Sequence, residues 1–191
     1  MPRLSSLILS LILMAAPVAA SAQAQYPEGT ETQRAAMQAL SWLDGEWRGT
    51  ATAKTGRETT VTMPHTERIG TAVGGSVRLI EGRSYNADGT TAFNALAVLS
   101  WDDAAGRYMM RSYANGQAID VPLEGDANGF RWVVPSRGGE IRYETRLVDG
   151  EWIETGDYVM PGREPMRVIE LRLRRIGDTG WPSADPVSPT P

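Results

Sequence analysis

The sequence predicts an all-β domain, an antiparallel up-and-down β-barrel of about ten strands with a short N-terminal helix closing one end. After residue 45 the chain consists of short runs in which apolar and polar residues alternate, the two-residue period of a β-strand. Turn dipeptides such as Asn115-Gly116 and Asp149-Gly150 separate the runs and are typical of tight hairpins. Successive hairpins make a meander, and closure into a barrel removes its exposed edges.

The first residues predict a secretory signal peptide over 1–22. Arg3 supplies the positive charge, residues 4–20 are apolar, and Ala-Ser-Ala at 20–22 is a small-x-small cleavage site, with a competing site at 22–24. An uncleaved anchor is the alternative, because the apolar run is at the lower limit for crossing a bilayer. After cleavage no second long apolar run remains. We therefore expect a periplasmic or secreted protein with no membrane span.

Composition and charge fit one domain of ordinary globular type. The chain has 191 residues, of which 41% are hydrophobic and 22% charged, enough to bury one core. Cysteine is absent, which excludes disulfides, thiolate-bound zinc and iron–sulfur clusters. A net charge of -4 makes nucleic acid an unexpected partner. Lys54 is the only lysine, and we expect many of the arginines to form cross-strand pairs with glutamates.

Residues 23–44 are predicted to form a lead-in and one short helix. Apolar residues recur near helical spacing between Glu31 and Leu43, and Thr30 or Thr32 is available as the N-cap. Asp44-Gly45 ends the helix. The alternation that follows opens the barrel domain, residues 45–176, with one face of its first strand formed by Trp47, Gly49, Ala51 and Ala53.

The remaining predicted strands follow one another without a helical stretch of convincing length. They cover approximately 58–69, 76–85, 91–101, 107–113, 117–123, 129–135, 140–148, 152–160 and 166–176. The last stretch, residues 177–191, contains four prolines and little apolar pattern. We expect it to be a disordered tail.

Residues 45–49, Gly-Glu-Trp-Arg-Gly, follow the predicted helix, and the meander ends in a basic strand at 170–175. In this layout the chain resembles the calycin superfamily, the lipocalins and their relatives, and in particular nitrobindin-like bacterial barrels of uncharacterised function. The resemblance implies that Trp47 closes one barrel end and that Arg172 or Arg174 covers it. Nitrobindin-like barrels hold haem through a histidine near the chain end. None is present here, so no haem or other cofactor is expected.

His65 is the only histidine and the one candidate for acid/base catalysis. It shares a predicted strand face with Glu67 and with apolar residues, so this face is expected to point inward. A structural, hydrogen-bonded histidine is one interpretation. In the other, His65 faces a cavity beside Glu67.

Glu81 and Arg83 share one face of the next predicted strand with apolar residues. If the odd-numbered faces of both strands point inward, these two residues join His65 and Glu67 in a polar patch, where an internal arginine could hold a ligand carboxylate. Alternatively, a bulge near Pro64 or Gly74-Gly75 turns one face outward and the charges are solvated.

Small residues on the strand at 91–101 predict space inside the barrel. Phe93 and Leu99 share a face with Ala95 and Ala97 there, and methionines could line the cavity. No metal-spaced cluster appears, so no metal is expected. The candidate ligand-binding residues are His65, Glu67, Glu81, Arg83, Phe93, Leu99, Met109 and Arg111.

The leading functional hypothesis is a barrel that binds a small hydrophobic or amphipathic molecule and does no chemistry; it rests on analogy of fold. One alternative is an enzyme that uses the cavity, with His65 as acid/base. A third hypothesis is a barrel filled with side chains that serves as a structural or interaction protein of the cell envelope.

Overall fold

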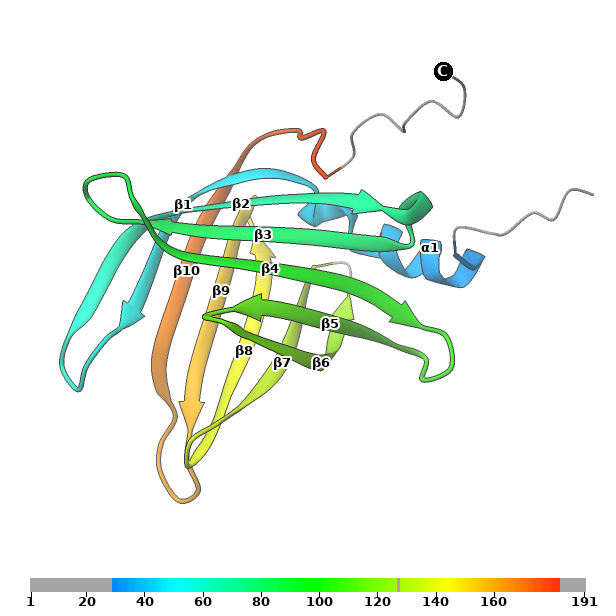
Figure 1. Ribbon diagram of the computed structural model, residues 1–191. Helices are drawn as coiled ribbons and strands as arrows, with labels where there is room; N and C mark the ends of the chain where they lie inside the picture. The colour runs from blue at the N-terminus through cyan, green and yellow to red at the C-terminus, as the bar shows by residue number, and fades with distance from the viewer. Residues whose placement is uncertain (1–28, 127, 183–191) are drawn as a thin grey trace, which may run out of the picture.

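The computed structural model describes residues 29–126 and 128–182, and it is all-β apart from one short helix and two single 3-10 turns (Figure 1). The predicted signal peptide and its cleavage sites lie outside these residues, as does 183–191 of the predicted tail. No helix in the described part of the chain is long and apolar enough to cross a membrane.

The helix α1 (Glu31–Ala39) begins at Thr30, one of the two predicted N-caps. Thr30 and Gln33 form a capping box, in which each side chain bonds the backbone N–H of the other. A 3-10 turn η1 (Ser41–Leu43) follows and leads into the first strand. Figure 1 shows α1 beside the end of β2 and the start of β3, so the helix covers one end of the barrel as the sequence predicts.

Ten strands follow in chain order, close to the predicted runs. Their bounds are β1 (Gly45–Lys54), β2 (Thr60–Ala72), β3 (Val77–Tyr85), β4 (Thr91–Asp102), β5 (Arg107–Ala114), β6 (Gln117–Asp126), β7 (Gly129–Ser136), β8 (Gly139–Val148), β9 (Glu151–Val159) and β10 (Met166–Gly177). A second 3-10 turn, η2 (Val73–Gly75), joins β2 to β3.

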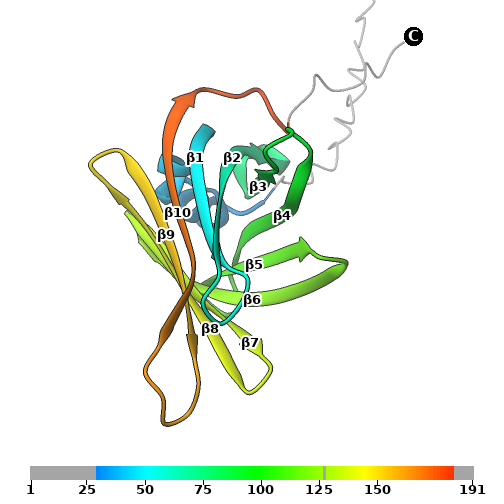
Figure 2. The same cartoon turned by 90° about the vertical axis from the view of Figure 1, so that its left-hand side faces the viewer.

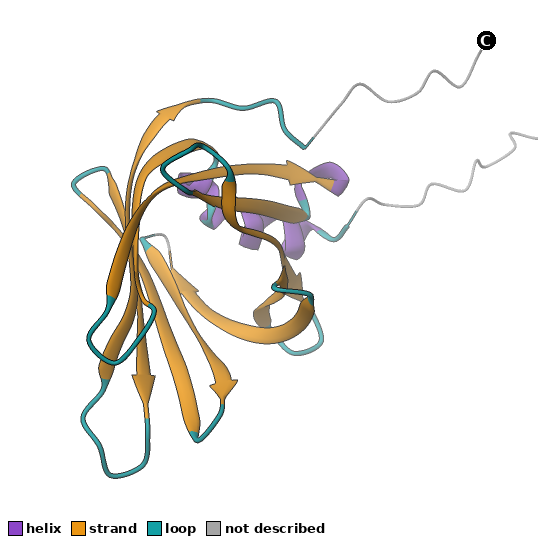
Figure 3. Ribbon diagram, turned by 60° about the vertical axis from the view of Figure 1, so that its left-hand side comes forward, coloured by secondary structure: helices purple, strands orange, loops and turns teal. Residues whose placement is uncertain are grey.

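The strands form one closed antiparallel barrel in which each strand pairs with its neighbours in sequence and β10 pairs with β1 (Figures 2 and 3). Closure leaves no strand with an unpaired edge, which is the physical reason for a meander to curl on itself. The predicted up-and-down barrel is confirmed.

The pairing register fixes which residues face the interior. Trp47 of β1 is buried and pairs with Glu67, and Gly49 pairs with His65, so the odd-numbered residues of these two strands point inward together. On β3 the inward residues are even-numbered, because His65 pairs with Ser84. On β4 they are odd-numbered again, as predicted from Phe93 to Trp101.

The end covered by α1 is filled with side chains. Trp47 donates its indole N–H to the Leu43 carbonyl (2.7 Å) and packs edge-on against Trp152, with ring centroids 5.6 Å apart. Thus Trp47 is a structural residue of the closed end, as the sequence predicts. The buried apolar residues of this core are Met37, Leu40, Leu43, Trp47, Ala51, Ile69, Leu99, Met110, Val121, Leu123, Phe130, Trp152, Leu171 and Leu173.

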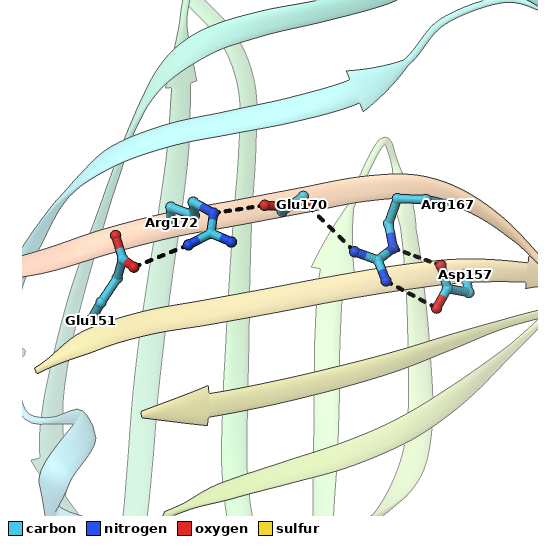
Figure 4. A network of polar contacts seen from close by, with 5 residues as sticks. All are labelled: Glu151, Asp157, Arg167, Glu170 and Arg172. Carbon is cyan, nitrogen blue, oxygen red and sulfur yellow. Dashed lines mark hydrogen bonds and ion pairs between the residues drawn. The ribbon is translucent and has the colours of Figure 1, made fainter. Parts of the chain in front are cut away.

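The prediction that Arg172 or Arg174 covers Trp47 is wrong. Arg172 and Arg174 pair with Thr50 and Arg48 and lie exposed on the outer face. Figure 4 shows Arg172 bonded to Glu170 of the same strand and to Glu151 of β9, in a network of ion pairs within β10 and between β10 and β9. Such pairs confirm the expected partnership of arginines with acidic side chains.

Trp181 has a defined place although it belongs to the predicted tail. The guanidinium of Arg68 lies 4.7 Å from the centroid of its ring, a cation–π contact on the outer face of β2. Its backbone passes directly over Gly70, where any Cβ would collide with the Trp181 carbonyl. The segment up to residue 182 therefore packs on the outside of the barrel.

Candidate functional site

A row of polar side chains crosses the interior of the barrel, where apolar residues would be expected to face. We call Ser84, His65, Glu67, Glu154 and Thr145 the inner polar cluster. They come from β3, β2, β9 and β8 and are placed inward by the register of these strands.

His65 links the first three members of the cluster. Its Nδ1 lies 2.7 Å from the Ser84 hydroxyl and its Nε2 lies 2.9 Å from Glu67 Oε1. Both His65 and Ser84 are 3% exposed. With Glu67 ionised, its carboxylate can only accept, so Nε2 carries the hydrogen of that bond. His65 is therefore buried, hydrogen-bonded through both ring nitrogens and inward-facing beside Glu67.

The Glu67 carboxylate is bonded on one side only. Its side chain is 10% exposed, and its Oε2 has no hydrogen-bond partner. The carboxylate lies over Gly82 of β3, where a Cβ would collide with both of its oxygens. Glycine at this position therefore makes room for a charged group inside the barrel, and a buried acceptor without a donor is costly.

Glu154 is the second acidic member and was missed by sequence reasoning. Burial, and after it the neighbouring Glu67 carboxylate, raises the pKa of Glu154 to about 8 from its ordinary 4.5. The Thr145 hydroxyl donates to Glu154 Oε2 (3.0 Å), and the Trp152 indole lies near enough to offset the rise slightly without forming a hydrogen bond. Glu154 is consequently protonated at neutral pH.

A signal for Glu154 was present in the sequence. Trp152 opens the predicted strand 152–160 with a large apolar side chain, and Glu154 stands two residues further along, so strand alternation places both on the same face. Tyr143 of β8 also faces this region, and burial followed by the charge of Glu154 raises its pKa.

Two of the predicted polar site residues, Glu81 and Arg83, lie on the outer face of the barrel. They are on β3, where Glu81 pairs with Arg68 and Arg83. Burial tends to raise the pKa of Glu81, but the bonds from Arg83 and Arg68 outweigh it and leave that pKa below its usual value. These residues border an outer groove of about 270 Å³. Their predicted placement beside His65 is wrong, and the alternative of an outward face is confirmed.

Met109 and Arg111 also point outward, because β5 is inward at even-numbered residues such as Met110. Arg111 forms an exposed ion pair with Asp120 (2.6 Å). Phe93 and Leu99 do face the interior. They lie at different depths, with Leu99 buried in the core and Phe93 partly exposed.

Solvent reaches inward-facing side chains in the half of the barrel away from α1. Along β4 the inward residues change from buried Leu99 to partly exposed Ala97, Ala95 and Phe93. The inward residues of β5 and β8 also change, from buried Met110 and Thr145 to partly exposed Ala114 and Ile141. A depression of about 390 Å³ lies at this rim, beside Asn94 and the turn at 114–118.

The arrangement can hold a polar group within a mainly apolar interior. The described residues contain no group of three or more His, Cys, Asp or Glu side chains placed to hold a metal ion. Arg78 is the only buried arginine or lysine among them, and each of its three guanidinium nitrogens is bonded, to the Asp44 carboxylate or to the Met37 carbonyl. The charge of Arg78 is therefore already neutralised by Asp44.

Comparison with solved structures finds the same fold. The crystal structure of Rv2717c from M. tuberculosis is similar with a TM-score of 0.56 over 74% of this chain and 97% of that chain, at 13% sequence identity. No protein-family model and no curated protein matches the sequence. A likeness at this level of identity concerns the barrel fold alone.

Proposed function

We propose that this protein is an exported barrel that binds a small amphipathic molecule in its interior and does no chemistry on it. The observation that carries the proposal is the gradient of exposure inside the barrel. Inward-facing residues are sealed at the end covered by α1 and reached by solvent at the other end. A closed wall with one filled and one open half is the arrangement of a ligand-binding barrel.

The open half offers apolar surface for the body of such a molecule. Phe93, Ile119, Val134, Ile141 and Ile169 all face inward and are partly exposed. Burying such surface against a ligand contributes about 25 cal/mol per Å². The inner polar cluster supplies the polar contacts that would orient the molecule, because Glu67 Oε2 is a buried acceptor in need of a donor.

An enzyme with His65 as acid/base has one observation in its favour, the hydrogen-bonded chain from Ser84 through His65 to Glu67. Catalysis by such a chain requires the serine hydroxyl to reach a bound molecule, but His65 and Ser84 are each only 3% exposed. The Ser84 hydroxyl is buried and bonded to the same ring. These contacts favour a binding protein over an enzyme.

Uptake of an apolar fluorescent probe tests the proposal. N-phenyl-1-naphthylamine should bind the purified full chain with enhanced fluorescence. Ala95→Phe should weaken binding at least tenfold, because Ala95 faces the open interior opposite Gly82. Asn94→Phe is the matched control, since Asn94 is exposed on the outer face of the same strand. Equal affinities for the two variants would contradict an internal site.

Native mass spectrometry of protein purified from its own host provides a second test. A bound small molecule that survives desolvation is the expected result, and Ala95→Phe should lose it while Asn94→Phe retains it. Absence of both a bound molecule and probe uptake would instead favour the alternative of a barrel filled with side chains.

A further inference from the structure

We infer that the inner polar cluster recognises a protonated amine, so that the molecule bound inside the barrel is an amphipathic organic cation whose ammonium group lies between Glu67 and Glu154. This inference rests on the proposed function and names the chemical class of its ligand.

The first step is the balance of donors and acceptors inside the barrel. Glu67 Oε2 is a carboxylate oxygen on a side chain that is nine-tenths buried, and it lacks a donor. Glu154 brings a second carboxyl group to the same region, close enough for the charge of Glu67 to act on it. Arg78 cannot serve either of them, because Asp44 and Met37 use its nitrogens. A ligand that supplies N–H donors and positive charge completes this set.

The second step concerns the two donors around Glu154. The Thr145 hydroxyl already bonds Glu154 Oε2, and the Trp152 indole N–H, on a residue buried in the core, has no partner and lies near the same carboxyl. Both groups can donate to a carboxylate, and neither is needed by a neutral acid. These two donors lower the pKa of Glu154 and would act together with a bound cation against burial and the Glu67 charge, which raise it.

The third step is the proton balance. An alkylammonium ion enters already protonated, and the proton of Glu154 leaves to solvent, so that one positive charge replaces another between the carboxylates. The other titratable groups that face Glu154 are Glu67 and His65 of β2 and Tyr143 of β8. A fatty-acid anion would add a third acidic group to this interior and should be rejected.

Competition between matched ten-carbon molecules tests the class of ligand. Decylamine should displace N-phenyl-1-naphthylamine at a concentration at least tenfold lower than decan-1-ol or decanoate at pH 7. Decyltrimethylammonium, which has charge but no N–H donor, should fall between. If decanol binds as well as decylamine, the inferred class is wrong while the proposed binding function stands. If none of the molecules and not even the probe binds, the proposed function itself fails.

Two substitutions locate the ammonium group. Glu67→Gln should weaken decylamine binding at least tenfold and change decanol binding less than twofold. Glu144→Gln is the control, because Glu144 is exposed on the outer face of β8, next to Thr145. An equal loss for the amine and the alcohol in Glu67→Gln would overturn the assignment, since it would indicate a general structural defect.

Calorimetry in buffers of different ionisation enthalpy measures the number of protons released when decylamine binds. Wild-type protein should release close to one proton for each decylamine bound at pH 7, and Glu154→Gln should release almost none. Release from both proteins, or from neither, would overturn the role of Glu154.

Discussion

At the scale of single residues, Glu154 is an acidic side chain whose surroundings raise its pKa strongly. Its carboxyl group lies inside the barrel with one hydrogen bond, from Thr145, and within range of the Glu67 carboxylate. Burial disfavours the charged form of Glu154, and the neighbouring Glu67 carboxylate adds repulsion through a medium that screens poorly. One of the two carboxyl groups therefore keeps its proton, and the raised pKa of about 8 assigns that proton to Glu154.

This proton makes stability depend on pH in a defined direction. Between pH 4.5 and about 8 the folded chain holds the Glu154 proton and the unfolded chain has released it, so stability falls as pH rises through this window. The slope approaches about 1.4 kcal/mol per pH unit at most. Below the window both states are protonated, and above it both are ionised, so the contribution is flat on either side.

We expect Glu154→Gln to remove this slope, because an amide has no proton to lose. Urea unfolding at pH 5, 6, 7 and 8 should show wild type losing stability toward pH 8 while the variant changes less, because the other titratable groups around Glu154 are the same in both proteins. Glu144→Gln, on the outer face, should follow wild type. Parallel curves for wild type and Glu154→Gln would contradict a buried proton at this residue.

At the scale of elements, α1 and η1 are attached to the barrel by polar bonds as well as by apolar packing. Arg78 of β3 is 1% exposed and binds the Asp44 carboxylate through two nitrogens (2.6 Å each). Its third nitrogen bonds the Met37 carbonyl near the helix end, which also accepts the Leu40 N–H (3.1 Å). Tyr108 of β5 donates to the Ala36 carbonyl (3.0 Å). The helix is thereby fixed across the closed end.

Removing Arg78 should therefore weaken the attachment of α1 and η1 to the barrel. We expect Arg78→Ala to destabilise the protein by about 1.5–3 kcal/mol, because it removes the charged hydrogen bonds to the half-exposed Asp44 carboxylate and a bond to the Met37 carbonyl. Arg111→Ala, which breaks an exposed ion pair with Asp120, should cost at most about 1 kcal/mol. Urea denaturation measures both variants, and similar losses would indicate that Arg78 contributes no more than a surface arginine.

Strand order and bounds could be predicted from sequence because turn residues and alternation are local signals, but the inward faces depend on pairing. Ala72 pairs with Val77, so four residues separate the paired ends of β2 and β3. An even number exchanges the parity of the inward face, which places Ser84 inside and Arg83 outside. Five residues separate Lys54 from Thr60, and there the parity is kept. Because the four residues between β2 and β3 reverse the inward face, Ser84 was not predicted as a partner of His65.

The same reasoning explains the error at β5. Four residues separate Asp102 from Arg107, so inward parity changes again and Met110 replaces Met109 in the core. The Trp47 cover failed for a different reason. Thr50 pairs with Arg172, so the alternation of β10 points that arginine to solvent, and no feature of the basic strand by itself shows which of its side chains face inward.

At the scale of the whole molecule, inward-facing residues are mostly buried in the half of the barrel covered by α1 and partly exposed in the other half. A core packed at the density of an organic crystal tolerates no added volume, whereas a wall that borders solvent does. The inner polar cluster lies where these halves meet, with Thr145 buried and Tyr143, one strand alternation further, partly exposed.

A pair of identical substitutions tests this division. Ala51 is 3% exposed in the filled half, and Ala95 is an inward residue of the open half. We expect Ala51→Leu to destabilise the protein by about 1–3 kcal/mol through overpacking, and Ala95→Leu to cost less than about 0.5 kcal/mol, because its added methyl groups enter space that solvent occupies. Thermal or urea unfolding of both variants measures the difference. Equal losses would mean that the interior is packed to the same density throughout, and with that result an internal binding site would have no space to occupy.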